Sequence, residues 1–95
     1  MAKNKKNPAG LELIQPKFSI GQEIHVVFWD GDIDAYNVEE FVCDWIRVTY
    51  KANSGQIEYG HGDIDCGYDE LNDLFETSYD AAQEAKTRNQ AMRGE

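Results

Sequence analysis

Two strongly apolar runs, residues 24–29 and 41–50, constrain the fold more than any other feature of the sequence. They are rich in β-branched and aromatic residues, which favour strands, and together they hold both tryptophans. Asp30-Gly31, a dipeptide typical of hairpin turns, ends the first run. Apolar residues occupy both alternating sets of positions in that run. We therefore expect this strand to be covered on both faces, as in a small curled barrel.

Turn and capping signals divide the rest of the chain into short elements. Thr77 and Asp80 have the spacing of an N-terminal capping box, and an Ala-rich segment follows them. The segment 60–73 contains three glycines and five acids, so we expect a loop with one helical turn over 68–73. We predict a C-terminal helix over residues 78–92 and strands over residues 23–29, 35–43, 45–51, 56–60 and 74–76.

These elements predict an α+β, mostly β domain. About five antiparallel strands would form a small barrel or a bent sheet, with one C-terminal helix packed across an open end. A chain of 95 residues corresponds to one small domain, which we assign to residues 11–92. Residues 1–10 are polar and carry three lysines, and we expect them to form a disordered basic tail.

Two short motifs resemble small phage and bacterial SH3-like barrel proteins. The first is Phe-x-Ile-Gly-Gln-x-Ile-x-Val over residues 18–26, and the second is Leu-Phe-Glu-Thr-x-x-x-Ala over residues 74–81. The resemblance covers residues 18–86 and implies a binding module, without naming a ligand. The chain departs from the family in its acid-rich loop, residues 60–73, which is longer than a simple connection.

The charge distribution limits the kinds of partner. The net charge is -9, and residues 18–76 contain 14 acids against only Arg47 and Lys51. Such a surface repels nucleic acid and anionic membranes and attracts cationic partners. The alternative is that the acidity serves only solubility. The sequence has no secretory apolar region, no apolar run of 18 residues and only two cysteines, so we expect a cytoplasmic protein with reduced thiols.

The acids and aromatic residues in the turns are the candidate binding residues. Acids occupy every second position after the first apolar run, and more acids follow in the loop. Tryptophan and tyrosine are common at the centres of protein interfaces. We therefore predict a partner-binding surface made of Asp30, Asp32, Asp34, Asp63, Asp65, Asp69, Glu70, Asp73, Trp29, Tyr36 and Tyr68.

No motif indicates a metal, a cofactor or a catalytic residue. An EF-hand loop that began at Asp30 would need glycine and glutamate where Ala35 and Phe41 stand. The histidines and cysteines lack the close spacing of a zinc site, and no nucleophile lies beside a base in the sequence. We predict no metal, no cofactor and no catalytic residues among His25, Cys43, His61 and Cys66.

The sequence therefore predicts a non-enzymatic, acidic protein-binding module. We expect a monomer or small homo-oligomer that occupies the basic, nucleic-acid-binding surface of a host defence protein, without binding nucleic acid itself. Phage anti-CRISPR and anti-restriction inhibitors are similar in kind, since they are short, acidic and without catalytic residues; such a protein would work in the host cytoplasm. The alternative is an SH3-like accessory domain of a larger assembly.

Overall fold

The computed structural model describes residues 15–52 and 54–94. It contains two antiparallel sheets and one C-terminal α-helix, which confirms the predicted mostly β, α+β class. The elements are β1 (Glu23–Asp30), β2 (Ala35–Val42), β3 (Trp45–Lys51), β4 (Ser54–Gly60), the 3-10 turn η2 (Leu71–Asp73), β5 (Leu74–Phe75) and α1 (Ser78–Met92). The predicted tail, residues 1–10, and the start of the predicted domain lie outside the described residues.

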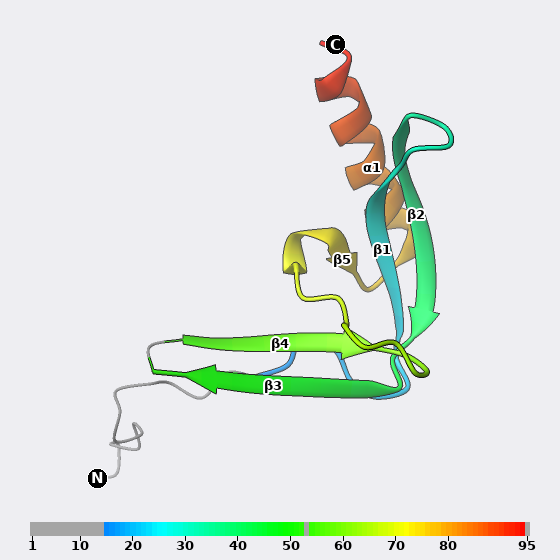
Figure 1. Cartoon of the computed structure of the whole chain (residues 1–95). Coiled ribbons are helices and arrows are strands. Elements are labelled where there is room, and N and C mark those ends of the chain that lie inside the picture. Colours follow the sequence, from blue (N-terminus) through cyan, green and yellow to red (C-terminus); the bar gives the residue numbers. More distant parts are fainter. Residues whose placement is uncertain (1–14, 53, 95) are drawn as a thin grey trace, which may run out of the picture.

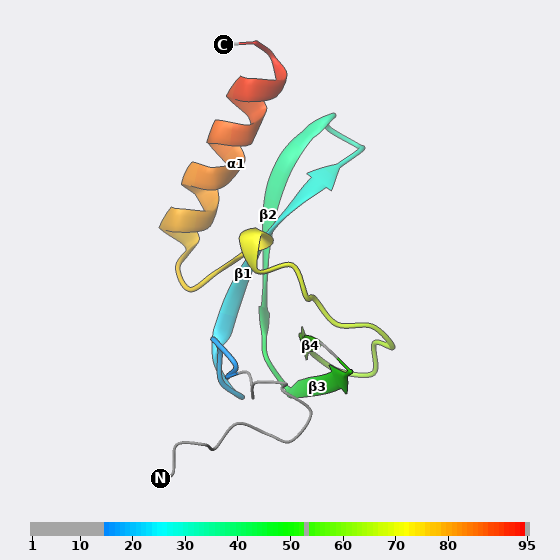
Figure 2. The ribbon, with the colours of Figure 1, turned by 90° about the vertical axis from the view of Figure 1, so that its left-hand side faces the viewer.

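The strands form two separate antiparallel sheets and do not close into a barrel, and helix α1 packs on a face of the first sheet instead of across an open end. One sheet has the order β2-β1-β5, and the other is the hairpin β3-β4 (Figure 1). The second hairpin lies crosswise at the lower end of the first and extends away from it (Figures 1 and 2). Beyond Tyr59, which bridges to Tyr68, β4 has no further strand beside it among the described residues, and the ladder therefore stays open.

Strand β1 is buried on both faces, as its two apolar faces predicted. One face contributes Ile24 and Val26 to a core at the junction of the two hairpins, which also contains Phe18, Phe41, Cys43, Tyr59 and Leu74. The opposite face contributes Val27 to a smaller core under α1, with Ala81 and Ala85. Each core is small, and β1 connects the two.

Thr77 caps the N-terminus of helix α1, and its hydroxyl accepts a hydrogen bond from the Asp80 amide at 3.1 Å, as the capping signal predicted. Its buried residues are Ala81 and Ala85, which bring the helix close to the sheet (Figure 2). Farther along the helix, the carboxamide of Asn89 hydrogen-bonds to the backbone of β2 as a neighbouring strand would. Its Oδ1 accepts from the Tyr36 amide at 2.8 Å, and its Nδ2 donates to the Tyr36 carbonyl at 3.2 Å.

Two of the three acids in the turn between β1 and β2 have a structural role there. The Asp30 carboxylate accepts from the Asp32 amide at 3.0 Å and from the Asn37 side chain at 3.1 Å, and thereby closes the turn. Asp34 has a φ of 55°, in the left-handed region that Asp and Asn tolerate better than most residues. Only Asp32 has no such structural role in the turn.

No helix in the described part of the chain combines the length and apolarity needed to span a membrane.

Candidate binding groove

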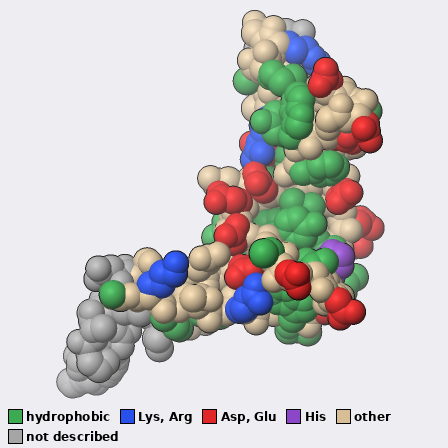
Figure 3. All heavy atoms as spheres, in the orientation of Figure 1, with side chains coloured by type: hydrophobic (Ala, Val, Ile, Leu, Met, Phe, Trp, Pro, Cys, Tyr) green, Lys and Arg blue, Asp and Glu red, His purple; other side chains and the backbone are tan. Residues whose placement is uncertain are grey.

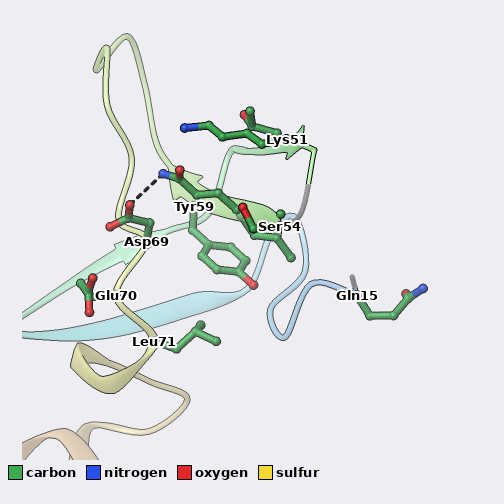
Figure 4. A pocket seen from close by; sticks show the side chains of 11 residues that line it. Gln15, Lys51, Ser54, Tyr59, Asp69, Glu70 and Leu71 are labelled. Carbon is green, nitrogen blue, oxygen red and sulfur yellow. Dashed lines mark hydrogen bonds between the residues drawn. The ribbon is translucent and has the colours of Figure 1, made fainter. Parts of the chain in front are cut away.

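A groove of about 600 Å³ lies between the β3-β4 hairpin and the segment that leads into η2. Asp69, Glu70 and Leu71 line one side, while Lys51 and Ser54 lie across from them on the hairpin (Figure 4). The Gln56 side chain donates to the Asp69 carboxylate at 2.8 Å and joins the two sides. The groove is therefore polar and acidic along one wall.

Tyr59 forms the floor of this groove and is fully buried. Its ring meets Phe18 edge-on, with the ring centroids 5.1 Å apart, and its hydroxyl accepts from the Lys17 amide at 2.9 Å. Its backbone exchanges two hydrogen bonds with Tyr68, at 2.9 and 2.8 Å. Tyr59 therefore connects β4 to Phe18, to the Lys17 backbone and to Tyr68.

The outer edge of β4 faces this groove. The hydrogen bonds to Tyr68 show that the Tyr59 backbone points away from β3. Backbone groups alternate along an antiparallel strand, so those of Ile57 and Gly55, which also line the groove, point the same way. Neither residue pairs with another strand on this side within the described residues. An unpaired strand edge of this kind can accept an extended peptide.

Arg47 fixes the loop over residues 61–68 to the β3-β4 hairpin, on the face that also carries Thr49 and Gln56. Its guanidinium binds both carboxylate oxygens of Glu58, at 3.1 and 2.7 Å, and also donates to the Asp65 carbonyl at 3.0 Å. Glu58 in turn accepts from the Gly67 amide at 3.0 Å. The hydrogen bond from Arg47 holds the pKa of Glu58 below its ordinary value, and the Gly67 amide adds to this effect.

Two glycines make room for Trp45 beneath this loop. A Cβ at Gly60 would overlap the Trp45 ring, and one at Gly67 would lie 2.7 Å from the Tyr59 carbonyl oxygen. The Trp45 indole donates to the Gly62 carbonyl at 3.2 Å. Packing against Trp45 therefore accounts for Gly60, and the close approach of the Tyr59 backbone and the Trp45 ring accounts for Gly67.

The predicted acids divide into those with a partner and those without. Asp30 closes its turn, Asp69 accepts from Gln56, and Asp73 pairs with Arg88 at 2.9 Å. The others make no side-chain hydrogen bond or ion pair to the described residues; they are Asp32, Asp34, Asp63, Asp65 and Glu70.

The turn acids and the loop acids lie at opposite ends of the β1-β2 hairpin. The turn follows Asp30, whereas the loop residues His61 and Tyr68 pack on Phe41, which pairs with Ile24. The six-residue separation along β1 corresponds to roughly 20 Å, about two Debye lengths at 0.1 M salt. The eight acids therefore form two separate electrostatic fields, one from the turn acids and one from the loop acids. In Figure 3, acidic side chains flank a strip of hydrophobic ones along this arm.

The predicted aromatic residues divide in the same way. Trp29, which is 46% exposed, meets Tyr36 edge-on near the turn, with the ring centroids 5.3 Å apart. Tyr68 stacks on Phe41 at the other end, with a centroid separation of 4.8 Å. Four of the predicted residues do come together there, since one hollow of about 150 Å³ is lined by Tyr68, Asp69, Glu70 and Asp73.

The groove offers no catalytic arrangement in the residues described as lining it. It contains no histidine or cysteine, and no base contacts the hydroxyls of Ser54 and Thr49. The thiol of Cys43 is fully buried elsewhere, and burial raises its pKa, which disfavours the nucleophilic thiolate. Cys66 lies exposed in the loop, apart from Cys43.

One cluster escaped the sequence analysis. Glu23 and His25 lie on the same face of β1, and Glu40 pairs with His25 across the hairpin. These three are the one group of potential metal ligands that the described residues contain, and none of the cysteines belongs to it. The alternation of Glu23 with His25 was visible in the sequence. The register that adds Glu40 was not.

No protein family model matches the chain, and comparisons with curated proteins and with solved structures also find no match.

Proposed function

We propose that this protein is a non-enzymatic binding module for a basic protein surface. The observation that carries the proposal is the lack of internal compensation for its acids. Of the 14 acids between residues 18 and 76, only Glu58 and Asp73 lie within 4.0 Å of a lysine or arginine nitrogen of the described residues. A cationic partner would supply the missing counter-charges and would be steered to this surface from solution.

The groove supports a particular way of binding. Ile57 and Gly55 lie beside the carboxylates of Asp69 and Glu70, on a strand edge that pairs with no other strand within residues 15–52 and 54–94. An extended segment could add to this edge through main-chain hydrogen bonds, while its lysine or arginine side chains meet the acidic wall. Such lysine- and arginine-rich surfaces are typical of nucleic-acid-binding proteins. We therefore propose an inhibitor that competes with nucleic acid for its partner, of the kind that phages direct against host defence.

The alternative is an accessory domain of a larger assembly. It is favoured by the large apolar side chains on the surface, among them Trp29, Ile33 and Val42, which are 46–57% exposed. In that case the apolar residues would make the contact and the acids would only keep the protein in solution.

The two proposals differ in how binding responds to charge. The heparin-binding proteins of a bacterial lysate serve as the source of basic partners, and the tagged chain captures them at low salt for identification by mass spectrometry. Association rates with the captured protein are then measured for three double variants that each remove two charges. D32N/D34N and D63N/D65N neutralise the two proposed fields, whereas E76Q/D80N is the matched control at the start of the helix.

We expect the first two variants to lower the association rate at least tenfold and to flatten its salt dependence, and the control to change it little. Excess duplex DNA should displace the chain from its partner. Equal effects of all three variants would show that net charge alone acts. Capture that resists both salt and DNA would favour the accessory domain, and failure to capture any nucleic-acid-binding protein would overturn the proposal.

A further inference from the structure

The imidazole of His25 lies between two carboxylates. It is only 5% exposed, although it belongs to a strand next to solvent-facing acids. Its Nε2 lies 3.5 Å from Glu23 Oε1, and its Nδ1 lies 3.6 Å from Glu40 Oε1. The two glutamates are 55% and 59% exposed, so solvent reaches the cluster from their side.

Neither ring nitrogen makes a normal hydrogen bond within the described residues. Both separations exceed the 2.7–3.2 Å of typical N–H···O bonds. A neutral imidazole carries a single N–H, so it can serve only one of the two carboxylates. In that form the other nitrogen has a lone pair free to bind a cation. No lysine or arginine pairs with either glutamate in the described part of the chain.

A divalent cation at Nε2 would fit this arrangement. Zinc binds histidine nitrogen and glutamate oxygen at about 2.0–2.2 Å, so two such ligands at a tetrahedral angle lie about 3.3–3.5 Å apart. The separation of Nε2 from Glu23 Oε1 is 3.5 Å. The second nitrogen of a metal-bound histidine usually donates its N–H to a carboxylate, which fixes the ring. Glu40 is in the position to accept it.

We propose that Glu23, His25 and Glu40 form a binding site for a divalent transition-metal cation of the zinc class. His25 Nε2 and the Glu23 carboxylate bind the ion, and Glu40 orients the ring. The exposed side of the cluster leaves the remaining coordination positions to water or to a ligand from another molecule. One potential ligand atom of each of the three residues already lies within 4.8 Å of the other two.

The site is independent of the proposed acidic binding surface. None of its three residues lines the groove or belongs to the predicted turn and loop acids. A bound cation would neutralise part of the charge near the lower end of β1. It would also tie β1 to β2 through their side chains, because Glu23 and His25 come from one strand and Glu40 from the other.

The test is a zinc titration of the full-length, chelator-treated protein that carries Cys66→Ser, so that the exposed thiol does not bind the metal. Calorimetry gives stoichiometry and Kd, and the 15N signals of the imidazole nitrogens report which ring binds. We expect one zinc per chain and a change at His25 Nε2. E23Q should weaken binding by more than tenfold and E40Q by about tenfold, the lower end for loss of an orienting carboxylate.

His61 supplies the matched control, since H61N should leave the zinc affinity unchanged. E23Q and E40Q alter exposed side chains and keep His25, so the test does not depend on replacing a buried residue. Equal affinity of E23Q and the parent, a ring signal that changes only at His61, or absence of saturable binding up to 1 mM zinc would each overturn the proposal.

Discussion

The contact between Asn89 and β2 gives the sharpest test of the described fold. The Asn89 carboxamide makes two hydrogen bonds to the Tyr36 backbone, at 2.8 and 3.2 Å, across 53 residues of sequence. A typical intramolecular hydrogen bond contributes about 1 kcal/mol net, so the pair contributes about 2 kcal/mol. Replacement by alanine offsets roughly 0.6 kcal/mol of this loss in unfolding free energy, because alanine is a better helix former than asparagine. We therefore expect Asn89→Ala to lower the free energy of unfolding by about 1.5 kcal/mol.

Urea denaturation, followed by circular dichroism, measures this change. With a slope of about 1–1.5 kcal/mol per molar for a domain of this size, the midpoint should fall by roughly 1 M. The thermal midpoint should fall by roughly 6–12 °C. The neighbouring Gln90→Ala is the control, since Gln90 makes no hydrogen bond to the described residues and alanine costs nothing there. Equal stability of N89A and Q90A would refute the structural role of Asn89.

Two further changes test the hairpin and its loop. Since the folded-state pKa of Glu58 is lowered from 4.5, its contribution to stability is present above that value and is lost as the pH falls through the folded pKa. The difference in unfolding free energy between the parent and E58Q should therefore shrink when urea denaturation is repeated from pH 6 to pH 3. A constant difference would contradict the Arg47 contact. Gly60→Ala should destabilise the fold by about 1–3 kcal/mol, because its Cβ would overlap Trp45. Gly31→Ala, where nothing lies within 4 Å, should have little effect, and equal denaturation midpoints would exclude the proposed Trp45 packing.

The sequence predicted the elements better than their arrangement. Strand β3 and helix α1 have the predicted bounds, and the other strands differ by one or two residues at an end. Local signals suffice for this, since Thr77 caps the helix and turn residues separate the strands. Whether strands close into a barrel depends on long-range strand pairing, which cannot be deduced from a single sequence. Here Tyr68 bridges to Tyr59 and β5 pairs with β1, so the two hairpins remain separate sheets.

The candidate site was predicted in part, for similar reasons. The acids of the turn and the loop were visible as a composition, but their separation follows from the length of the β1-β2 hairpin. The sequence also did not predict the structural roles of two of these acids, since Asp30 closes a turn and Asp73 binds Arg88. The β4 edge, which has no strand beside it among the described residues beyond Tyr59, could not be foreseen, because it depends on where the Tyr59–Tyr68 bridge ends.

The position of β1 has a consequence for the order in which the chain folds. Its partner β2 follows directly, and that hairpin closes a short loop. Its other neighbours, Leu74 in β5 and the α1 residues that cover Val27, come much later in the chain. During synthesis the Val27 face of β1 therefore stays uncovered until Ala81 and Ala85 are available, and the core on the Ile24 and Val26 face is completed only with Leu74. Contacts between such distant segments slow folding and lengthen the exposure of apolar strands. The partly synthesised chain is the form most in need of protection by chaperones.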